Sequence, residues 1–103
     1  MEHAKRHARD FTEILGAPLT PTELDDCSRV VLHSWNRLFT ELERSGMVSY
    51  IFTYQVQGKV ATLAVVTRAG LIRTVFPLRD VDLWWKRHLA AVEVTERAKR
   101  LGL

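Results

Sequence analysis

Three short apolar segments constrain the fold of this 103-residue chain more than any other feature. Along residues 47–57, apolar or aromatic side chains occupy every second position and mostly polar ones the positions between, which is the period of a β-strand. Residues 60–67 are apolar on both faces, which predicts a strand in the interior of its sheet. Residues 71–76 predict a third strand, which Pro77 ends.

The connections between these segments are short and contain glycine. Residues 57–59 (Gln-Gly-Lys) and 68–70 (Arg-Ala-Gly) predict two tight turns. Because turns of this length join antiparallel neighbours, the sequence predicts an antiparallel β-meander. Along the first strand, we expect Tyr50, Phe52 and Tyr54 to face the core together.

A capping box opens the helix that precedes the strands. Residues 20–23, Thr-Pro-Thr-Glu, combine a threonine cap, a proline in the first turn and a glutamate three positions after the cap. The apolar residues that follow recur at steps of three and four, which predicts one long helix that Gly46 ends. Its apolar stripe consists of Leu24, Cys27, Val31, Trp35, Leu38 and Leu42.

Two further helices are expected, one toward each end of the sequence. Residues 2–15 have helix-forming composition and are followed by a glycine. Residues 80–101 predict a last helix that Asp80 or Asp82 caps. The sequence therefore predicts a single α+β domain over residues 1–103, with the helices on one face of a meander of three or more strands and the C-terminal helix packed on the sheet.

Composition limits the classes of protein to which the chain can belong. It is 47% hydrophobic and 26% charged, which is ordinary for a globular domain. Its apolar runs are much shorter than the roughly 20 residues of a membrane span, so we expect no membrane insertion. A single cysteine excludes an internal disulfide and fits the cytoplasm. The net charge of +3 is compatible with RNA or an acidic protein as partner.

The first residues concentrate positive charge where a helix dipole disfavours it. Lys5 and Arg6 lie near the expected first turn, between His3 and His7. A bound phosphate would reverse the sign of these interactions, whereas a solvated terminus would make them nearly neutral. The two histidines have a spacing that can bind a metal, but no third ligand is evident and no metal site is predicted.

Arg73 interrupts the third expected strand and is followed by Thr74. A guanidinium on a sheet face can hold a phosphate by two hydrogen bonds and stabilise charge in a transition state. The alternative is an arginine on the solvent side of an edge strand, where it discourages aggregation.

The segment of residues 84–88, Trp-Trp-Lys-Arg-His, mixes aromatic and charged side chains, as surfaces that stack bases do. The alternative places Trp84 and Leu89 in the core, with the charges at a solvated rim. Cys27 lies on the buried stripe of its expected helix, which argues against a nucleophile.

Two stretches together resemble a known family. Residues 3–11, HAKRHARDF, resemble the opening motif of small toxin nucleases, and residues 61–77, ATLAVVTRAGLIRTVFP, resemble their paired strands. These nucleases belong to the barnase/EndoU/colicin/RelE-like superfamily of metal-independent ribonucleases, which are often toxin domains of bacterial and phage-encoded proteins. Their layout of N-terminal helices followed by an antiparallel sheet agrees with the expected element order.

The resemblance implies an endoribonuclease in which the 2′-hydroxyl of RNA attacks the adjacent phosphate. It implies a catalytic set of His7, Arg73 and Thr74, with His3, Lys5 and Arg6 at the substrate. It implies no metal and no cofactor, and a cognate immunity or antitoxin protein as a further partner. The competing hypothesis is a small non-enzymatic protein of the immunity, antitoxin or phage-inhibitor type, whose contact surface is the long helix or Trp84 and Trp85.

Overall fold

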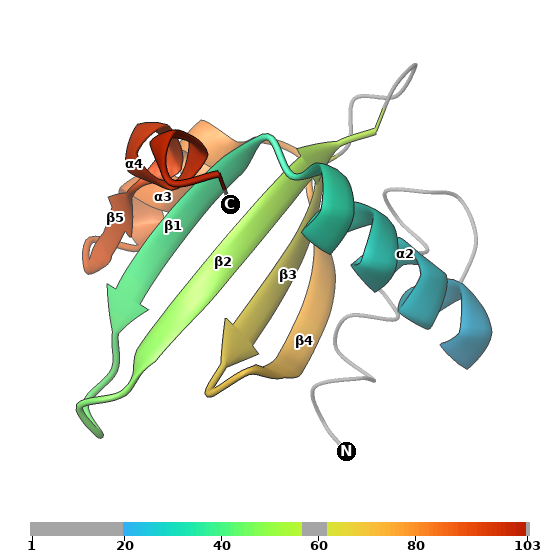
Figure 1. Ribbon diagram of the computed structural model, residues 1–103, viewed down its shortest axis with the longest axis horizontal. Coiled ribbons are helices and arrows are strands. Elements are labelled where there is room, and N and C mark those ends of the chain that lie inside the picture. Colours follow the sequence, from blue (N-terminus) through green and yellow to red (C-terminus); the bar gives the residue numbers. More distant parts are fainter. Residues whose placement is uncertain (1–19, 57–61, 103) are drawn as a thin grey trace.

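The computed structural model describes residues 20–56 and 62–102. They form a five-stranded antiparallel sheet and three helices (Figure 1), which confirms the α+β class. The predicted helix over residues 2–15 and the predicted turn at 57–59 lie outside the described residues. The elements in chain order are α2 (Pro21–Ser34), β1 (Arg37–Leu42), β2 (Val48–Gln55), β3 (Thr62–Arg68), β4 (Leu71–Leu78), α3 (Val81–Arg87), β5 (Ala91–Glu93) and α4 (Thr95–Arg100).

The strands are ordered β4-β3-β2-β1-β5, so β2 to β4 form the predicted meander, β1 extends it by one strand and β5 adds to its far side. β3 lies between two neighbours, as its apolar composition predicts. The turn at Ala69 and Gly70 has positive φ at both residues, 53° and 78°. Pro77 does not end β4, which continues to Leu78. A proline is tolerated there because β4 is at the margin of the sheet, where no ladder hydrogen bond is lost on its outer side.

The capping box at the start of α2 is confirmed. The Thr20 hydroxyl accepts a hydrogen bond from the Glu23 backbone N–H, and the Glu23 carboxylate accepts one from the Thr20 N–H, at 3.2 and 3.1 Å. The predicted continuation of this helix to Gly46 is wrong, because α2 ends at Ser34 and β1 follows.

The prediction failed because the apolar spacing of residues 35–42 is compatible with both a helix and a strand. The apolar positions 35, 38 and 42 fit a helix, but Leu38 and Phe39 are both buried although they are consecutive. In a strand, consecutive side chains point to opposite faces, so each of these two can enter a different part of the core. Pairing of β1 with both β2 and β5 then stabilises the extended backbone.

The predicted single helix over residues 80–101 is also wrong. It is divided into α3 and α4 by β5, in which Val92 pairs with Thr40 of β1. Asp80 caps α3 as predicted, accepting hydrogen bonds from two backbone N–H groups of the first turn. Leu89, predicted in the core, lies in the turn before β5 and is 92% exposed.

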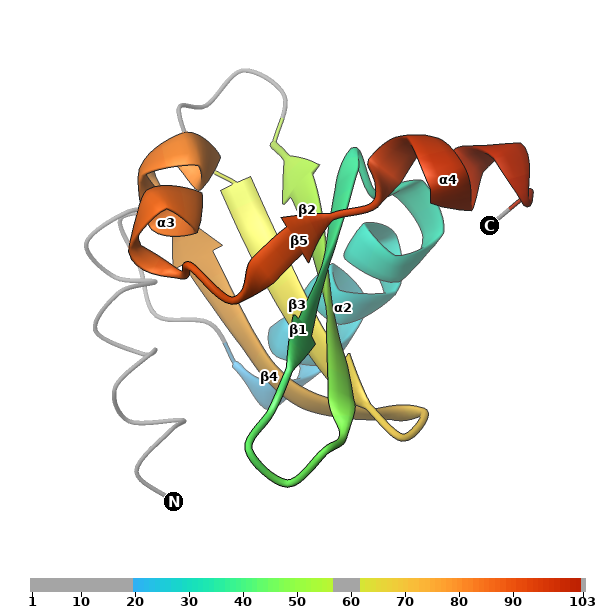
Figure 2. The ribbon, with the colours of Figure 1, turned by 90° about the vertical axis from the view of Figure 1, so that its left-hand side faces the viewer.

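Helices cover both faces of the sheet, which corrects the prediction of helices on a single face. α2 packs through Val31 on Leu63 and Val65, and α4 packs through Ala98 on Leu38. α3 lies on the other face (Figure 2), where its two tryptophans surround Phe39. We refer to the two sides as the α2/α4 face and the α3 face.

Among the described elements, α2 and α4 leave part of the α2/α4 face uncovered (Figure 1). Tyr50, predicted in the core, lies on this part and is 43% exposed. The buried side chains of β2 are instead Ser49, Ile51 and Thr53, which alternate with it and lie on the α3 face. Phe52 and Tyr54 are half-buried against the cluster that contains α2, so only part of the predicted core face of β2 is in the core.

An ion-pair network attaches α3 and β5 to the sheet. The Arg37 guanidinium on β1 forms two hydrogen bonds with Glu93 and one with Asp82, at 3.0 to 3.1 Å. It also lies over the rings of Phe39 and Trp85. The hydrogen bonds from Arg37 lower the pKa of Glu93, so this carboxylate is ionised at neutral pH. The network holds α3 at a fixed place on its face of the sheet.

Candidate functional site

A β-bulge on β4 determines where Arg73 points. Thr74 pairs with Val66, but the next pair of the ladder is Ile72 with Thr67, so Arg73 is the extra residue. A bulge shifts the alternation of side chains by one position. As a result, Arg73 and Thr74 both lie on the α3 face, although they are consecutive in the strand.

Arg73 meets a carboxylate that two other polar groups also contact. Glu43, one residue beyond β1, accepts a hydrogen bond from Arg73 Nη1 at 2.9 Å and one from Arg68 Nη1 at 2.7 Å. The hydroxyl of Ser49 donates to the same carboxylate at 2.8 Å. We call Glu43, Ser49, Arg68 and Arg73 the Glu43 cluster; its members come from β2, β3, β4 and the loop after β1.

The Glu43 cluster is held in place by backbone structure. The Glu43 N–H donates to the Met47 carbonyl, and the Gly46 N–H donates to the Glu43 carbonyl, which closes the loop between β1 and β2. Ser49 is only 2% exposed, and it pairs across the ladder with Arg68. The two arginines therefore extend from strands of the sheet, while the carboxylate extends from a hydrogen-bonded turn.

Electrostatics keep Glu43 ionised. Hydrogen bonds from Arg68 and then from Ser49 lower the pKa of its carboxyl group below the ordinary value. Two guanidinium groups share this single carboxylate, so the three charged members together carry a net positive charge. Arg73 has the most exposed side chain of the three, at 45%, against 32% for Arg68 and 23% for Glu43. The unused donors of Arg73 are therefore accessible to a ligand.

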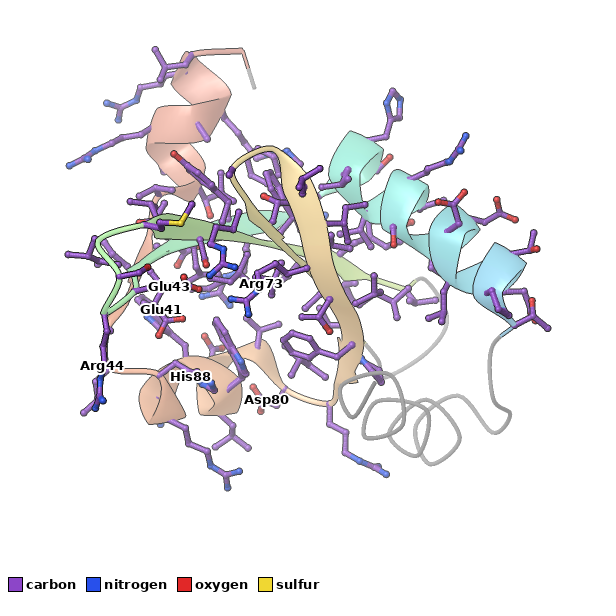
Figure 3. The ribbon with its side chains drawn as sticks, turned by 90° about the horizontal axis from the view of Figure 1, so that it is seen from below. Glu41, Glu43, Arg44, Arg73, Asp80 and His88 are labelled. Carbon is purple, nitrogen blue, oxygen red and sulfur yellow. The ribbon has the colours of Figure 1, made fainter. Side chains whose placement is uncertain are left out.

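A histidine faces the same space from α3. His88 caps the C-terminal end of α3, and its ring stacks on Trp84 with 4.6 Å between the centroids. Its Nδ1 lies 2.8 Å from the Trp84 carbonyl oxygen, which can only accept, so Nδ1 carries the proton and Nε2 is free to exchange one. Figure 3 shows Glu41, Glu43, Arg73 and His88 around the space between the sheet and α3.

The structure brings some of the predicted site residues together. Arg73 and Thr74 share the α3 face, beside the Glu43 cluster. His3, Lys5, Arg6 and His7 lie outside the described residues, and so does the predicted approach of His7 to Arg73. Cys27 is half-buried, and burial raises the pKa of its thiol, which agrees with the prediction that it is not a nucleophile.

Sequence reasoning missed Glu43, Ser49, Arg68 and His88 as site residues. Glu43 was expected inside a helix and Arg68 in a turn, and these placements hid the contacts of Glu43 with Arg68 and Arg73. His88 was expected at a charged rim. The bulge itself leaves no local signal in the sequence. The strand pattern did indicate that Ser49 and Arg68 lie on strands or at their ends, and pairing of those strands would have brought them together.

Neither tryptophan of the sequence 84–88 forms the exposed contact surface considered above. Both are half-buried against Phe39, and the Trp85 indole N–H donates to the Ala91 carbonyl at 2.9 Å. Within residues 20–56 and 62–102, no group of three or more histidine, cysteine or acidic side chains is arranged to hold a metal ion. None of the helices in that part of the chain is long and apolar enough to cross a membrane.

Comparisons with known proteins give no match to a family model, to a curated protein or to a solved structure. The features of this chain that bear on function are the chemistry of the Glu43 cluster and the two sequence stretches that resemble toxin ribonucleases. Chemically, the two guanidinium groups of the cluster can bind a singly charged oxyanion between them, and Thr74 and His88 lie on the same face of the sheet.

Proposed function

We propose that this chain cleaves RNA without a metal ion, and that the scissile phosphate binds at Arg68 and Arg73 on the α3 face. The observation that carries the proposal is the bulge of β4, which turns Arg73 toward Glu43 and leaves Thr74 on the same face of the sheet. In this reaction the 2′-hydroxyl attacks the adjacent phosphate in line. The products are a 2′,3′-cyclic phosphate and a free 5′-hydroxyl.

The arginines supply the stabilisation of charge in this proposal. The phosphorane-like transition state carries more negative charge than the ground-state diester, and fixed guanidinium donors stabilise the added charge. Arg73, with unused donors and the more exposed side chain, contacts the phosphate directly. The hydroxyl of Thr74 supplies one further hydrogen bond.

Two proton transfers complete the reaction. One group takes the proton of the attacking 2′-hydroxyl, and another gives a proton to the departing 5′-oxygen. We assign one transfer to His88, because the Trp84 carbonyl fixes its tautomer and leaves Nε2 for proton exchange. The other belongs to His7, the histidine that the sequence resemblance assigns to catalysis, with Lys5, Arg6 and His3 contributing to phosphate binding.

The biological setting follows from the same proposal. An RNA-cleaving chain acts where RNA is, so we place it in the bacterial cytoplasm as a toxin of bacterial or phage origin. Such an enzyme needs an inhibitor in the cell that makes it, and we propose a cognate immunity or antitoxin protein as its partner.

The proposal is tested by incubating the purified chain with an RNA oligonucleotide in the presence of EDTA. We expect the RNA to be cleaved and a DNA oligonucleotide of the same sequence to stay intact, because DNA lacks the attacking 2′-hydroxyl. RNA that survives a broad titration of protein, with and without EDTA, would contradict the proposal. Cleavage of both oligonucleotides would contradict the reaction assigned to it.

The second candidate function is binding of a protein partner, and the uncovered part of the α2/α4 face favours it. Leu42 and Val48 pair there across β1 and β2, next to Tyr50, and Val92 of β5 lies on the same face. All four side chains are substantially exposed. Exposed apolar patches of this kind are typical of interaction surfaces.

A pair of matched substitutions tests this second candidate. Leu42 is 66% exposed in the patch, and Leu89 is 92% exposed in the turn between α3 and β5. In a complex with a protein partner, we expect Leu42→Glu to weaken binding about tenfold or more, the effect of losing one good interface contact. We expect Leu89→Glu to leave the affinity unchanged, as measured by calorimetry. Equal effects of the two substitutions would exclude this surface.

A further inference from the structure

The Glu43 carboxylate has the hydrogen-bond partners that a bound phosphate would need. Its two oxygens accept from two guanidinium groups and one hydroxyl, at 2.7 to 2.9 Å. These are the donors and distances of charge-assisted hydrogen bonds to a phosphate diester. We infer that Glu43 occupies the phosphate site in the free protein and that an incoming phosphodiester displaces it from Arg68 and Arg73. This inference rests on the proposed function and adds an internal competitor to it.

The positions of the charged groups allow this exchange. The arginines extend from β3 and β4, which pair with each other along their whole lengths. Glu43 extends from the loop after β1, and its backbone is fixed by the hydrogen bonds of that loop. The exchange therefore needs a rotation of the Glu43 side chain and no rearrangement of the chain. Its side chain is 23% exposed, so an open path to water exists.

The exchange also conserves charge in the site. A carboxylate and a phosphodiester each carry one negative charge, so either one leaves the same net charge beside the two arginines. Both together would place two anions within a few ångströms, which costs free energy unless one leaves. Glu43 therefore weakens the binding of every oxyanion, and an RNA strand needs contacts beyond the phosphate to displace it.

A neighbouring glutamate gives a matched control. Glu41 lies two residues earlier, on the same face of the sheet, and Figure 3 shows it beside Glu43. Within the described part of the chain, Glu41 forms no hydrogen bond or ion pair with Arg68 or Arg73. Replacing either glutamate by glutamine removes the same charge, but only one replacement breaks the contacts with the arginines.

The test is a titration with inorganic phosphate in metal-free buffer at physiological salt, followed by calorimetry or by amide chemical shifts. We expect Glu43→Gln to bind phosphate about tenfold more tightly than the unsubstituted protein, because two partly exposed ion pairs no longer have to be broken. Glu43→Ala should change the affinity in the same direction. Glu41→Gln should change it by less than about threefold, since only screened, longer-range charge is lost.

Unchanged or weaker phosphate binding by both Glu43 variants would overturn the inference, and so would an equal gain in Glu41→Gln. Adding Arg73→Ala to Glu43→Gln should abolish the gain, and a gain that persists would place the phosphate elsewhere. The outcome is independent of RNA cleavage. Tighter phosphate binding by the Glu43 variants without any RNA cleavage would refute the proposed function and support competition by Glu43. RNA cleavage without tighter phosphate binding by these variants would support the proposed function and refute the competition.

Discussion

Replacing Arg73 with alanine is expected to lower the rate of RNA cleavage by about 10²- to 10³-fold, the effect of removing one fixed donor from a developing oxyanion. The bulge of β4 directs this guanidinium toward Glu43, and because its side chain is the more exposed of the two arginines we propose it as the principal contact with the scissile phosphate. Arg73→Lys should retain part of the activity, because an ammonium keeps the charge but not the paired donors. Initial cleavage rates at saturating RNA are the measurement.

A second arginine controls for the general loss of positive charge. Arg29 is a highly exposed residue of α2, on the other side of the sheet, where it pairs only with Asp25 among the described residues. Arg29→Ala should therefore leave the cleavage rate within about twofold, since a remote surface charge is screened by salt. Similar losses in Arg29→Ala and Arg73→Ala would show that net charge, and not the position of Arg73, supports the activity.

Replacing Phe39 with alanine is expected to destabilise the fold by about 3–5 kcal/mol, the usual effect of truncating a buried phenylalanine. Phe39 is fully buried, and its ring contacts both Trp84 and Trp85 edge-on, with centroids 5.3 and 5.2 Å away. The loss is a large part of the stability of a domain of this size. Denaturant unfolding followed by tryptophan fluorescence measures it.

The control for this substitution is Leu89→Ala, which removes an exposed apolar side chain near α3. Its effect should stay within about 0.5 kcal/mol, as for most surface substitutions. A loss below about 1 kcal/mol for Phe39→Ala would contradict the assignment of Phe39 to the centre of the α3-side core. Because His88 stacks on Trp84, the same substitution should also disturb the site.

Features with a local cause were predictable from the sequence. The capping box of α2 needs only four neighbouring residues, and the turn at Ala69 and Gly70 needs only a tight connection between two apolar strands. The alternation in residues 48–55 gave β2, and the apolar composition of β3 gave its interior position. These signals do not depend on which strands meet, so the meander of the α+β fold could be derived from them.

The missed elements depend on contacts between distant parts of the chain. Residues 37–42 have apolar spacings that fit a helix, and β1 forms because it can pair with β2 on one side and β5 on the other. The three residues of β5 are too few to show a period, so residues 80–101 resembled a single helix. The prediction of helices on a single face of the sheet followed from these two errors.

As for the fold, only those parts of the candidate site that have a local signal in the sequence could be predicted. Arg73 could be proposed as a site residue because it breaks the apolar pattern of a strand, and Thr74 because it follows Arg73 in the stretch that resembles toxin ribonucleases. Glu43 and His88 could not be identified, because the contact of Glu43 with Arg73 depends on the loop after β1 and on the bulge, and the position of His88 depends on the packing of α3. Nothing in the sequence near either residue reports those three features.

The most direct test of the central claim uses a DNA oligonucleotide that carries a single ribonucleotide, incubated with the protein in EDTA and examined by mass spectrometry. Attack by the 2′-hydroxyl predicts one cut, directly 3′ of the ribonucleotide, with a 2′,3′-cyclic phosphate on one product and a 5′-hydroxyl on the other. Arg73→Ala should lose this cut. An intact oligonucleotide, a requirement for metal ions, or a 5′-phosphate at the cut would contradict metal-independent RNA cleavage at the Glu43 cluster.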